Sequence, residues 1–246
     1  MIFTVATQKG GTGKTTTAAA LAQAAAMAQK SVLAVDLDPQ GNLSHALAGD
    51  PEQPGVYDLL TGTPIRDTIQ TTPQGLDLIS GQWSLSTLGN DRDARILSGL
   101  LGSVRAEYDM IIIDTPPTAG ILQYMGIYAA DGVIIPVQSD VYALDTLQRV
   151  IQTVSAISEN AERNIIILGV VITQYDGRSI LSRQLVDSIT QAAAEQGTTV
   201  IGGIRQGIAI REAQALQRNL FEYAPRSNPA VDYKELYDFI EWEVMA

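Results

Sequence analysis

The segment from Gln8 to Thr16, with the sequence QKGGTGKTT, constrains the fold of this chain more than any other stretch. It follows residues 2–6, whose β-branched and aromatic side chains predict a buried strand, and it precedes an alanine-rich stretch that predicts a helix up to Lys30. A glycine-rich loop between a strand and a helix points consecutive backbone N–H groups into one concavity, and the helix N-terminus adds partial positive charge there. The sequence therefore predicts a phosphate-binding loop, whose binding residues are Gly10, Gly11, Thr12, Gly13 and Thr16.

Two side chains of this loop carry further chemistry. Lys14 is expected to reach the β and γ phosphates of a bound nucleotide, and Thr15 to offer its hydroxyl group to Mg²⁺. Mg²⁺ is a hard cation that takes oxygen ligands and tends to keep several waters. The loop thus indicates a site for phosphate groups together with Mg²⁺.

Carboxylates end two of the expected strands. Residues 31–36 end in Asp36, with Asp38 two positions later, and the apolar stretch 108–114 ends in Asp114. Because ligands of parallel sheets bind beyond the carboxyl ends of the strands, these side chains are expected beside the phosphate-binding loop, where Asp114 would orient a Mg²⁺-bound water. For Asp38 one alternative stays open, since an Asp-Pro pair often only starts a turn.

The remaining pattern alternates strands with helices. We expect a helix over residues 92–107, a strand over 132–137 with a helix over 142–157, and a strand over 165–172 with a helix over 180–195. Residues 42–92 indicate short helices and an edge strand or hairpin, with His45 on a helix surface and Trp83 in packing. The predicted fold is α/β, with a mostly parallel central sheet and helices on both faces, in a single domain over residues 1–246.

Composition excludes several classes of site. The chain has no cysteine and a net charge of -11, which rules out disulfides, thiolate metal sites, iron–sulfur clusters and a surface that is basic throughout. The apolar run of residues 18–28 is too short to span a bilayer. We expect a cytoplasmic protein in which any contact with nucleic acid is a local patch.

The loop resembles the deviant Walker A motif of the ParA/MinD branch of P-loop ATPases. Gln8 stands where the general motif has its first glycine, and an additional lysine stands at Lys9. The resemblance implies that Lys9 reaches the nucleotide of a partner subunit; the alternative is a solvated loop lysine. It also implies that Asp38, in the sequence VDLDPQGN, positions the attacking water. Lys9, Lys14 and Asp38 are then the catalytic candidates, and Thr15, Asp38 and Asp114 the candidates for binding Mg²⁺.

Later stretches extend the resemblance over nearly the whole chain. They are PVQ at residues 136–138 with YAL at 142–144, YDGR at 175–178, and a loop at 203–213 that lies beside the adenine in this family. Arg205 and Gly207 are therefore expected at the base, although Arg205 stands where the family usually has proline and Gln206 where it has arginine. We expect no winged or helix-turn-helix segment before Met1, as in the short, Soj-like type.

The family implies a Mg²⁺-dependent ATPase that forms a homodimer around two ATP molecules. Such an ATPase binds DNA non-specifically, associates with the nucleoid in that state, and is stimulated by a ParB-like or other centromere-binding protein. Residues 163–226 hold seven arginines and five acidic residues, so a basic patch is expected there. The candidates are Arg178, Arg183, Arg211 and Arg218; alternatively these arginines are scattered or pair with nearby acids.

Two other functions stay open. A MinD-like membrane-surface ATPase needs a basic amphipathic terminal helix, but residues 233–246 hold four acids and one lysine, which anionic lipid repels. The terminal helix, expected from Val231, should instead pack on the domain through Leu236, Phe239, Ile240 and Val244. A binding module with ATP as a purely structural ligand would leave Asp38 without a role.

Overall fold

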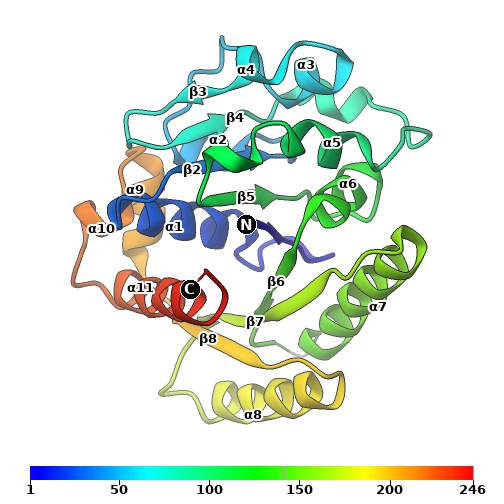
Figure 1. Cartoon of the computed structure of the whole chain (residues 1–246). Coiled ribbons are helices and arrows are strands. Elements are labelled where there is room, and N and C mark those ends of the chain that lie inside the picture. Colours follow the sequence, from blue (N-terminus) through cyan, green and yellow to red (C-terminus); the bar gives the residue numbers. More distant parts are fainter. Residues whose placement is uncertain (141, 246) are drawn as a thin grey trace.

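An eight-stranded sheet forms the centre of the molecule (Figure 1). The computed structural model describes residues 1–140 and 142–245, with side chains through Glu243. The strand order is β3-β4-β2-β5-β1-β6-β7-β8, and every pair of neighbours is parallel except β3 with β4. The strands are β1 (Ile2–Val5), β2 (Val32–Asp36), β3 (Gln70–Thr71), β4 (Asp77–Ile79), β5 (Met110–Asp114), β6 (Gly132–Gln138), β7 (Ile166–Tyr175) and β8 (Val200–Arg205).

Helices cover both faces of the sheet, which confirms the predicted fold class. In Figure 1 the sheet runs from top to bottom, with α1, α9, α10 and α11 on its left and α5, α6 and α7 on its right. The α-helices are α1 (Lys14–Met27), α2 (Asn42–Ala46), α3 (Val56–Thr61), α4 (Ile65–Thr68), α5 (Ile96–Gly102), α6 (Ile121–Ala129), α7 (Ala143–Ala161), α8 (Ile180–Glu195), α9 (Ile208–Ala215), α10 (Leu220–Tyr223) and α11 (Asn228–Ile240). Two 3₁₀ turns, η1 (Trp83–Thr87) and η2 (Arg105–Glu107), and a π turn, η3 (Glu241–Met245), complete the elements.

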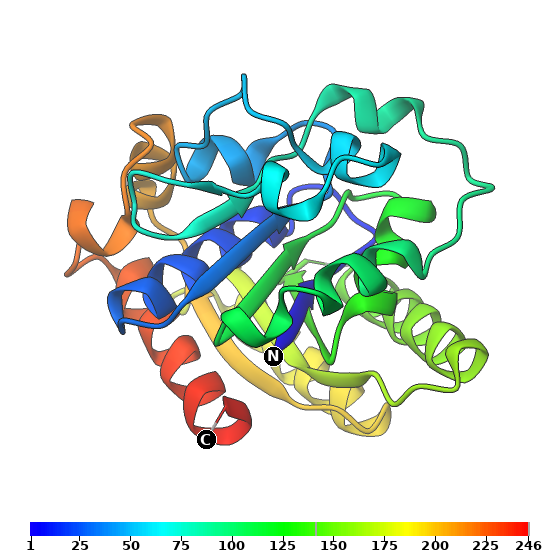
Figure 2. The ribbon, with the colours of Figure 1, turned by 45° about the horizontal axis from the view of Figure 1, so that its top comes forward.

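The core lies in layers on the two faces. Along β5, Ile112 packs on the side of α1 and α11, while Ile111 and Ile113 pack on the side of α5 and α6. Strands buried on both faces need no alternation of polar and apolar residues, which explains the continuous apolar run of β5. Helices α1 and α11 lie side by side in Figures 1 and 2, joined by the buried Tyr233 and Leu236.

Two predicted helices differ in detail. Instead of one helix over residues 92–107, the chain forms α5 and then η2. Gly99 and Gly102 are weak helix formers, and the Ser103 hydroxyl donates to the carbonyl oxygen of Leu100 (2.7 Å), which favours the end of the helix there. Helix α11 starts at Asn228, three residues earlier than expected, because the side chain of Ser227 accepts from the Ala230 N–H and caps it.

The exposure of apolar side chains tests the packing predictions. Leu236 and Ile240 are buried as expected, whereas Phe239 is 37% exposed. Val244 lies outside the described side chains. The prediction that Trp83 serves packing is wrong, because its side chain is 70% exposed. In the part of the chain that the structure describes, no helix has the length and apolar character needed to cross a membrane.

Candidate functional site

The parallel register brings the predicted site residues to one edge of the sheet. Val5, at the end of β1, pairs with Asp114 of β5, which in turn pairs with Asp36 of β2. The chain leaves all three strands at this edge. The phosphate-binding loop, the Asp36–Asp38 turn and the segment after Asp114 are therefore neighbours.

The loop itself is held by the end of β7. Gly11 and Gly13 have φ angles of 78° and 85°, the left-handed region that favours glycine. The hydroxyl group of Thr173 donates to the Thr12 carbonyl (2.8 Å), and the Gln174 amide donates to the Gly11 carbonyl (2.7 Å). A Cβ on Gly13 would lie 3.3 Å from the Thr173 methyl group, so this position has little room for a side chain.

Lys14 lies at the bottom of the site, only 6% exposed. Its Nζ donates to the carbonyl oxygen of Lys9 (3.1 Å), within the same loop. Burial lowers the pKa of Lys14, and the carboxylates of Asp114 and Asp38 counteract that effect. A phosphate oxygen could replace the Lys9 carbonyl as the acceptor and would add the negative charge that a buried ammonium group requires.

Thr15 and Asp114 form the second polar pair of the site. The Thr15 hydroxyl donates to Oδ2 of Asp114 (2.6 Å), while Oδ1 of Asp114 is buried without a hydrogen-bond partner among the described residues. Burial, and next the charge of Asp36, raises the pKa of Asp114 well above its ordinary value. A buried, unpartnered carboxylate oxygen beside a hydroxyl group fits the oxygen ligands that Mg²⁺ takes. Over the described residues no group of three or more His, Cys, Asp or Glu side chains could hold a metal.

Asp36 organises the turn that carries Asp38, a role that the sequence did not reveal. Its carboxylate accepts from the Ser44 N–H (2.9 Å), the Ser44 hydroxyl (2.8 Å) and the Asp38 N–H (3.1 Å). Burial raises the pKa of Asp36 to about 6. Asp38 is 7% exposed, and its Oδ1 accepts from the Gln40 N–H (2.9 Å). The carboxylate of Asp38 is therefore held in place at the cavity wall.

Lys9 is not free in solvent, because it pairs within its own chain. Its Nζ forms an ion pair with Asp140 and lies 5.2 Å from the ring centroid of Tyr142. Both members of the ion pair are about 30% exposed, with 28% for Lys9 and 29% for Asp140. No pattern in the sequence indicated Asp140 as the partner of Lys9.

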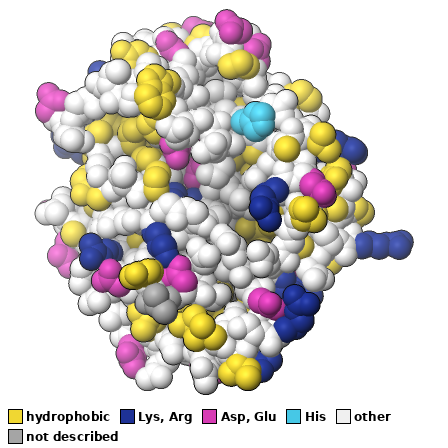
Figure 3. All heavy atoms as spheres, turned by 180° about the vertical axis from the view of Figure 1, so that it is seen from behind, with side chains coloured by type: hydrophobic (Ala, Val, Ile, Leu, Met, Phe, Trp, Pro, Cys, Tyr) yellow, Lys and Arg dark blue, Asp and Glu magenta, His cyan; other side chains and the backbone are white. Residues whose placement is uncertain are grey.

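Two adjoining cavities fit the two ends of a nucleotide. One, of about 460 Å³, is lined by the loop from Gly10 to Thr16 together with Asp38, His45 and Pro117. Figure 3 views this side of the molecule, with the only histidine, His45, shown in cyan, and charged side chains lie in its central hollow. The second cavity, of about 290 Å³, shares Gly13, Thr16, Gln174 and Gln214 with the first.

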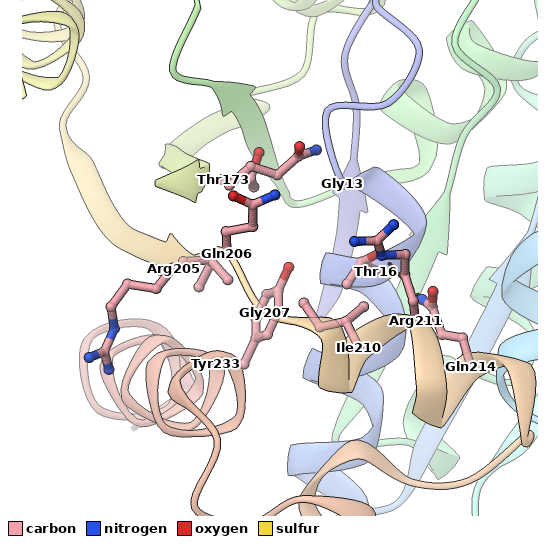
Figure 4. Close-up of a pocket in the computed structure, with 12 residues that line it drawn as sticks. Gly13, Thr16, Thr173, Arg205, Gln206, Gly207, Ile210, Arg211, Gln214 and Tyr233 are labelled. Carbon is pink, nitrogen blue, oxygen red and sulfur yellow. Dashed lines mark hydrogen bonds between the residues drawn. The ribbon is translucent and has the colours of Figure 1, made fainter. Parts of the chain in front are cut away.

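Arg205, expected at the base, pairs with another side chain at the wall of the second cavity (Figure 4). The lining of this cavity includes Gln206, Gly207, Ile210 and Tyr233. Arg205 belongs to the same wall, but its guanidinium group points away and binds Asp232 of α11, with an Nη2–Oδ1 distance of 2.5 Å. Gln206 points toward Thr173 instead. In this structure Asp232 therefore holds the Arg205 guanidinium group, while Gln206 lines the cavity.

The four candidate DNA-binding arginines are all exposed, and Arg211 lines the second cavity. Arg178 and Arg211 line a further hollow of about 570 Å³ next to it. Arg183 donates to the Gly177 carbonyl (2.9 Å), and Arg218 stacks on Tyr223 near the end of α9. Of the four, Arg178 forms an ion pair, with Asp176.

Comparison with known proteins gives consistent matches. A family model described as an AAA domain matches residues 1–167. The chromosome-partitioning ATPase Soj of Thermus thermophilus is 33% identical over 98% of this chain and 94% of its own length. The sporulation initiation inhibitor protein Soj of Bacillus subtilis is 34% identical over 96% of both chains.

Solved structures agree with these matches. Apo McdA of Cyanothece has a TM-score of 0.84 at 25% identity, covering 96% of this chain and 98% of its own. Cobyrinic acid a,c-diamide synthase of Mycobacterium smegmatis, with bound ADP and magnesium, has a TM-score of 0.80 at 28% identity, covering 100% and 96%. MinD of Pyrococcus horikoshii, with Mg-ADP, has a TM-score of 0.81 at 25% identity, covering 100% and 98%.

Proposed function

Since the chain belongs to the family of Soj and ParA partition ATPases, we propose that it hydrolyses ATP with Mg²⁺ and uses the ATP-bound state to position DNA. The observation that carries this proposal is that Lys14, Thr15 and Asp38 line one cavity at the end of the sheet, with the buried Asp114 bonded to Thr15 behind it. Phosphoryl transfer to water needs mainly charge stabilisation and a placed nucleophile. These four side chains supply both.

Each residue of the cavity has a separate task in this proposal. Lys14 binds phosphate oxygens in place of the Lys9 carbonyl. Thr15 and Asp114 would hold Mg²⁺, which neutralises phosphate charge when bound. Asp38, already fixed by Gln40 on one oxygen, orients the attacking water with the other. Asp36 acts as a positioning residue, because it fixes the Asp38 N–H and Ser44.

The base of ATP would occupy the cavity shown in Figure 4. Ile210 and the ring of Tyr233 offer apolar contact, and the Gln206 amide offers both a donor and an acceptor to the edge of the ring. Arg205 supports this wall through its bond to Asp232 rather than by touching the base.

Lys9 is the residue through which two copies would depend on each other. In this structure its ammonium group is neutralised by Asp140 of the same chain. The phosphates of ATP bound to a second copy carry more negative charge than one carboxylate. They therefore compete with Asp140 for Lys9 when the two copies meet. ATP would then sit between two copies, and the homodimer would form with ATP and not with ADP.

The dimer would bind DNA without sequence preference through Arg178, Arg183, Arg211 and Arg218. Doubling the number of arginines on one surface makes DNA binding depend on dimerisation. A ParB-like or other centromere-binding protein would stimulate hydrolysis, and the ATP-bound protein would associate with the nucleoid. The family implies both, and the buried Leu236 and Ile240 favour a terminal helix packed on the domain over the membrane-surface alternative.

Two substitutions test the proposed division of labour. Lys14→Ala should abolish ATP binding, because it removes the buried ammonium group that meets the phosphates. Asp38→Ala should keep ATP affinity within about threefold of wild type but lower turnover by roughly a hundredfold or more, since it removes only the group that acts on the attacking water. ATP affinity by equilibrium titration and phosphate release check both. An Asp38→Ala protein that hydrolyses ATP at the wild-type rate would refute the assignment.

A further inference from the structure

Trp83 is an exposed aromatic side chain on a rigid base. Its ring is 70% exposed, yet the next apolar residue of η1, Leu85, is buried. The Leu85 N–H donates to the Gln82 carbonyl (2.9 Å), and the Ser86 hydroxyl donates to the Trp83 carbonyl (2.7 Å). The Gln82 amide in turn donates to Asp58 (2.9 Å). The exposure of Trp83 is therefore imposed by a fixed backbone rather than by a loose loop.

A groove of about 470 Å³ adjoins this tryptophan. Its walls are η1, the Asp38–Gln40 turn and residues 116–122, where Pro116 and Pro117 stiffen the chain. Asp38 is the one charged residue among those that line it. Interface cores are depleted of charge and enriched in tryptophan, which often carries much of the binding free energy. The groove with Trp83 has the composition of such a core.

The groove and the phosphate cavity share one rim. Asp38, Gln40 and Pro117 line both. A body that approaches the phosphates over Asp38 therefore also meets the rim of the groove. Under the proposed function that body is a second copy of this chain, because the Lys9 side chain of a second copy would complete the site. A two-fold axis then places the same surface of both copies in the interface.

We propose that Trp83 anchors the ATP-bound dimer by packing, together with this groove, against the second copy. The inference rests on the proposed function and adds to it the residue that supplies apolar contact next to the hydrolytic carboxylate. It also couples dimerisation to the position of Asp38. The Gly81 N–H donates to the Ser44 hydroxyl (2.8 Å), and a Cβ on Gly81 would lie only 2.6 Å from the Asp38 carbonyl oxygen. The segment that carries Trp83 thus packs directly on the turn that carries Asp38.

The chain contains its own reporter and its own control. It has two tryptophans, Trp83 and Trp242, and Trp242 is 78% exposed. Glu241, the residue before Trp242, pairs with Lys30 at an O–N distance of 2.9 Å. Lys30 follows the C-terminal end of α1, which is the end remote from the phosphate-binding loop. Trp242 therefore lies far from the groove. Trp242→Phe leaves Trp83 as the sole fluorophore, and Trp83→Phe leaves Trp242.

In the Trp242→Phe protein, Mg²⁺ with ATPγS should shift the emission of Trp83 to shorter wavelength and lower its quenching by acrylamide, whereas Mg-ADP should not. The Trp83→Phe protein should show no change in Trp242. Sedimentation velocity on the same samples reports whether the dimer is present. A sample that sediments as a dimer while Trp83 stays fully quenchable overturns the inference and leaves the proposed ATPase intact.

Truncation gives the energetic test. Trp83→Ala should weaken the ATPγS dimer by roughly tenfold to a hundredfold, the usual effect of removing a tryptophan anchor, while ATP affinity of the monomer stays unchanged. The matched control, Trp242→Ala, should leave both unchanged. Equal dimer strength in the two variants contradicts the inference. A wild-type chain that stays monomeric with ATPγS contradicts the proposed dimerising function itself, and the anchor falls with it.

Discussion

At the scale of single residues, side chains from distant segments hold the residues of the proposed site in place. Lys14, Thr15, Asp38 and Asp114 could be selected because each stands at a fixed distance from a glycine or from the end of an apolar strand. In the structure Lys14, Thr15 and Asp38 line one cavity, and Asp114 accepts a hydrogen bond from Thr15. The partners of these residues depend on tertiary contacts between distant segments, as with Asp140 on Lys9, 131 residues apart. No local pattern announces such contacts.

Asp36 gives a prediction about pH that belongs to this scale. Burial raises its pKa to about 6 from an ordinary 3.8. The unfolded chain therefore loses the proton first, so the native state loses stability as pH rises from about 4 to about 6. Wild type should lose roughly 2 to 3 kcal/mol over this window relative to Asp36→Asn, which does not titrate.

Urea unfolding of the nucleotide-free protein measures this difference. Asp109→Asn is the control, because hydrogen bonds from Ser31 lower the pKa of Asp109. Its contribution to stability changes only below its ordinary pKa, so its difference from wild type should be constant between pH 4.5 and pH 7. A flat difference for Asp36→Asn would contradict the account of that carboxylate.

At the scale of elements, the alternation of strands and helices could be predicted from the sequence, whereas the close packing of loops could not. The central strands could be predicted because they are continuous apolar runs, and β3 with β4 forms the antiparallel pair expected in residues 42–92. The position of η1 follows from contacts of Gln82 and Gly81 with α3 and α2, which no periodicity encodes. This is why Trp83 was expected in packing and is exposed instead.

Gly81 allows a test of the contact between η1 and the catalytic turn. A Cβ there would lie 2.6 Å from the Asp38 carbonyl oxygen and 2.8 Å from Cγ of Asp36, so the turn must move. Gly81→Ala should lower the ATP turnover number at least tenfold, change ATP affinity less, and destabilise the fold by about 1 to 3 kcal/mol. Gly99→Ala, in the exposed part of α5 with open space around it, should leave turnover unchanged. Equal turnover in both variants would show that the contact does not set the position of Asp38.

At the scale of the whole molecule, the net charge of -11 predicts that DNA binding is confined to one surface. Arg183→Glu combined with Arg218→Glu should weaken binding of the ATP-bound protein to unrelated duplexes alike, and should reduce its salt dependence, while basal ATP hydrolysis stays near normal. The control is Arg66→Glu with Arg95→Glu, an equal change of charge near α4 and α5, where both arginines pair with acids. Fluorescence anisotropy at one fixed ionic strength compares them. If both double variants bind DNA like wild type, the patch lies elsewhere.

Features of the whole molecule could be predicted where they depend on residues that are close together in the sequence. The parallel sheet and the edge that carries the site follow from strand order and local motifs. The direction of Arg205 could not be predicted, because it depends on Asp232, 27 residues away on α11. The expectation of Arg205 at the base rested on the family loop alone, which does not encode its pairing with Asp232.

The dimer that depends on Lys9 is the central claim, and sedimentation velocity tests it most directly. With Mg²⁺ and ATPγS, the wild-type chain of 26.3 kDa should sediment as a dimer, and with Mg-ADP as a monomer. Lys9→Ala should bind ATPγS with wild-type affinity and yet remain a monomer. The variant has no ammonium group to place at the phosphates of the ATPγS that is bound to the second copy. A Lys9→Ala protein that dimerises as strongly as wild type would contradict the account and identify Lys9 as an ordinary loop lysine.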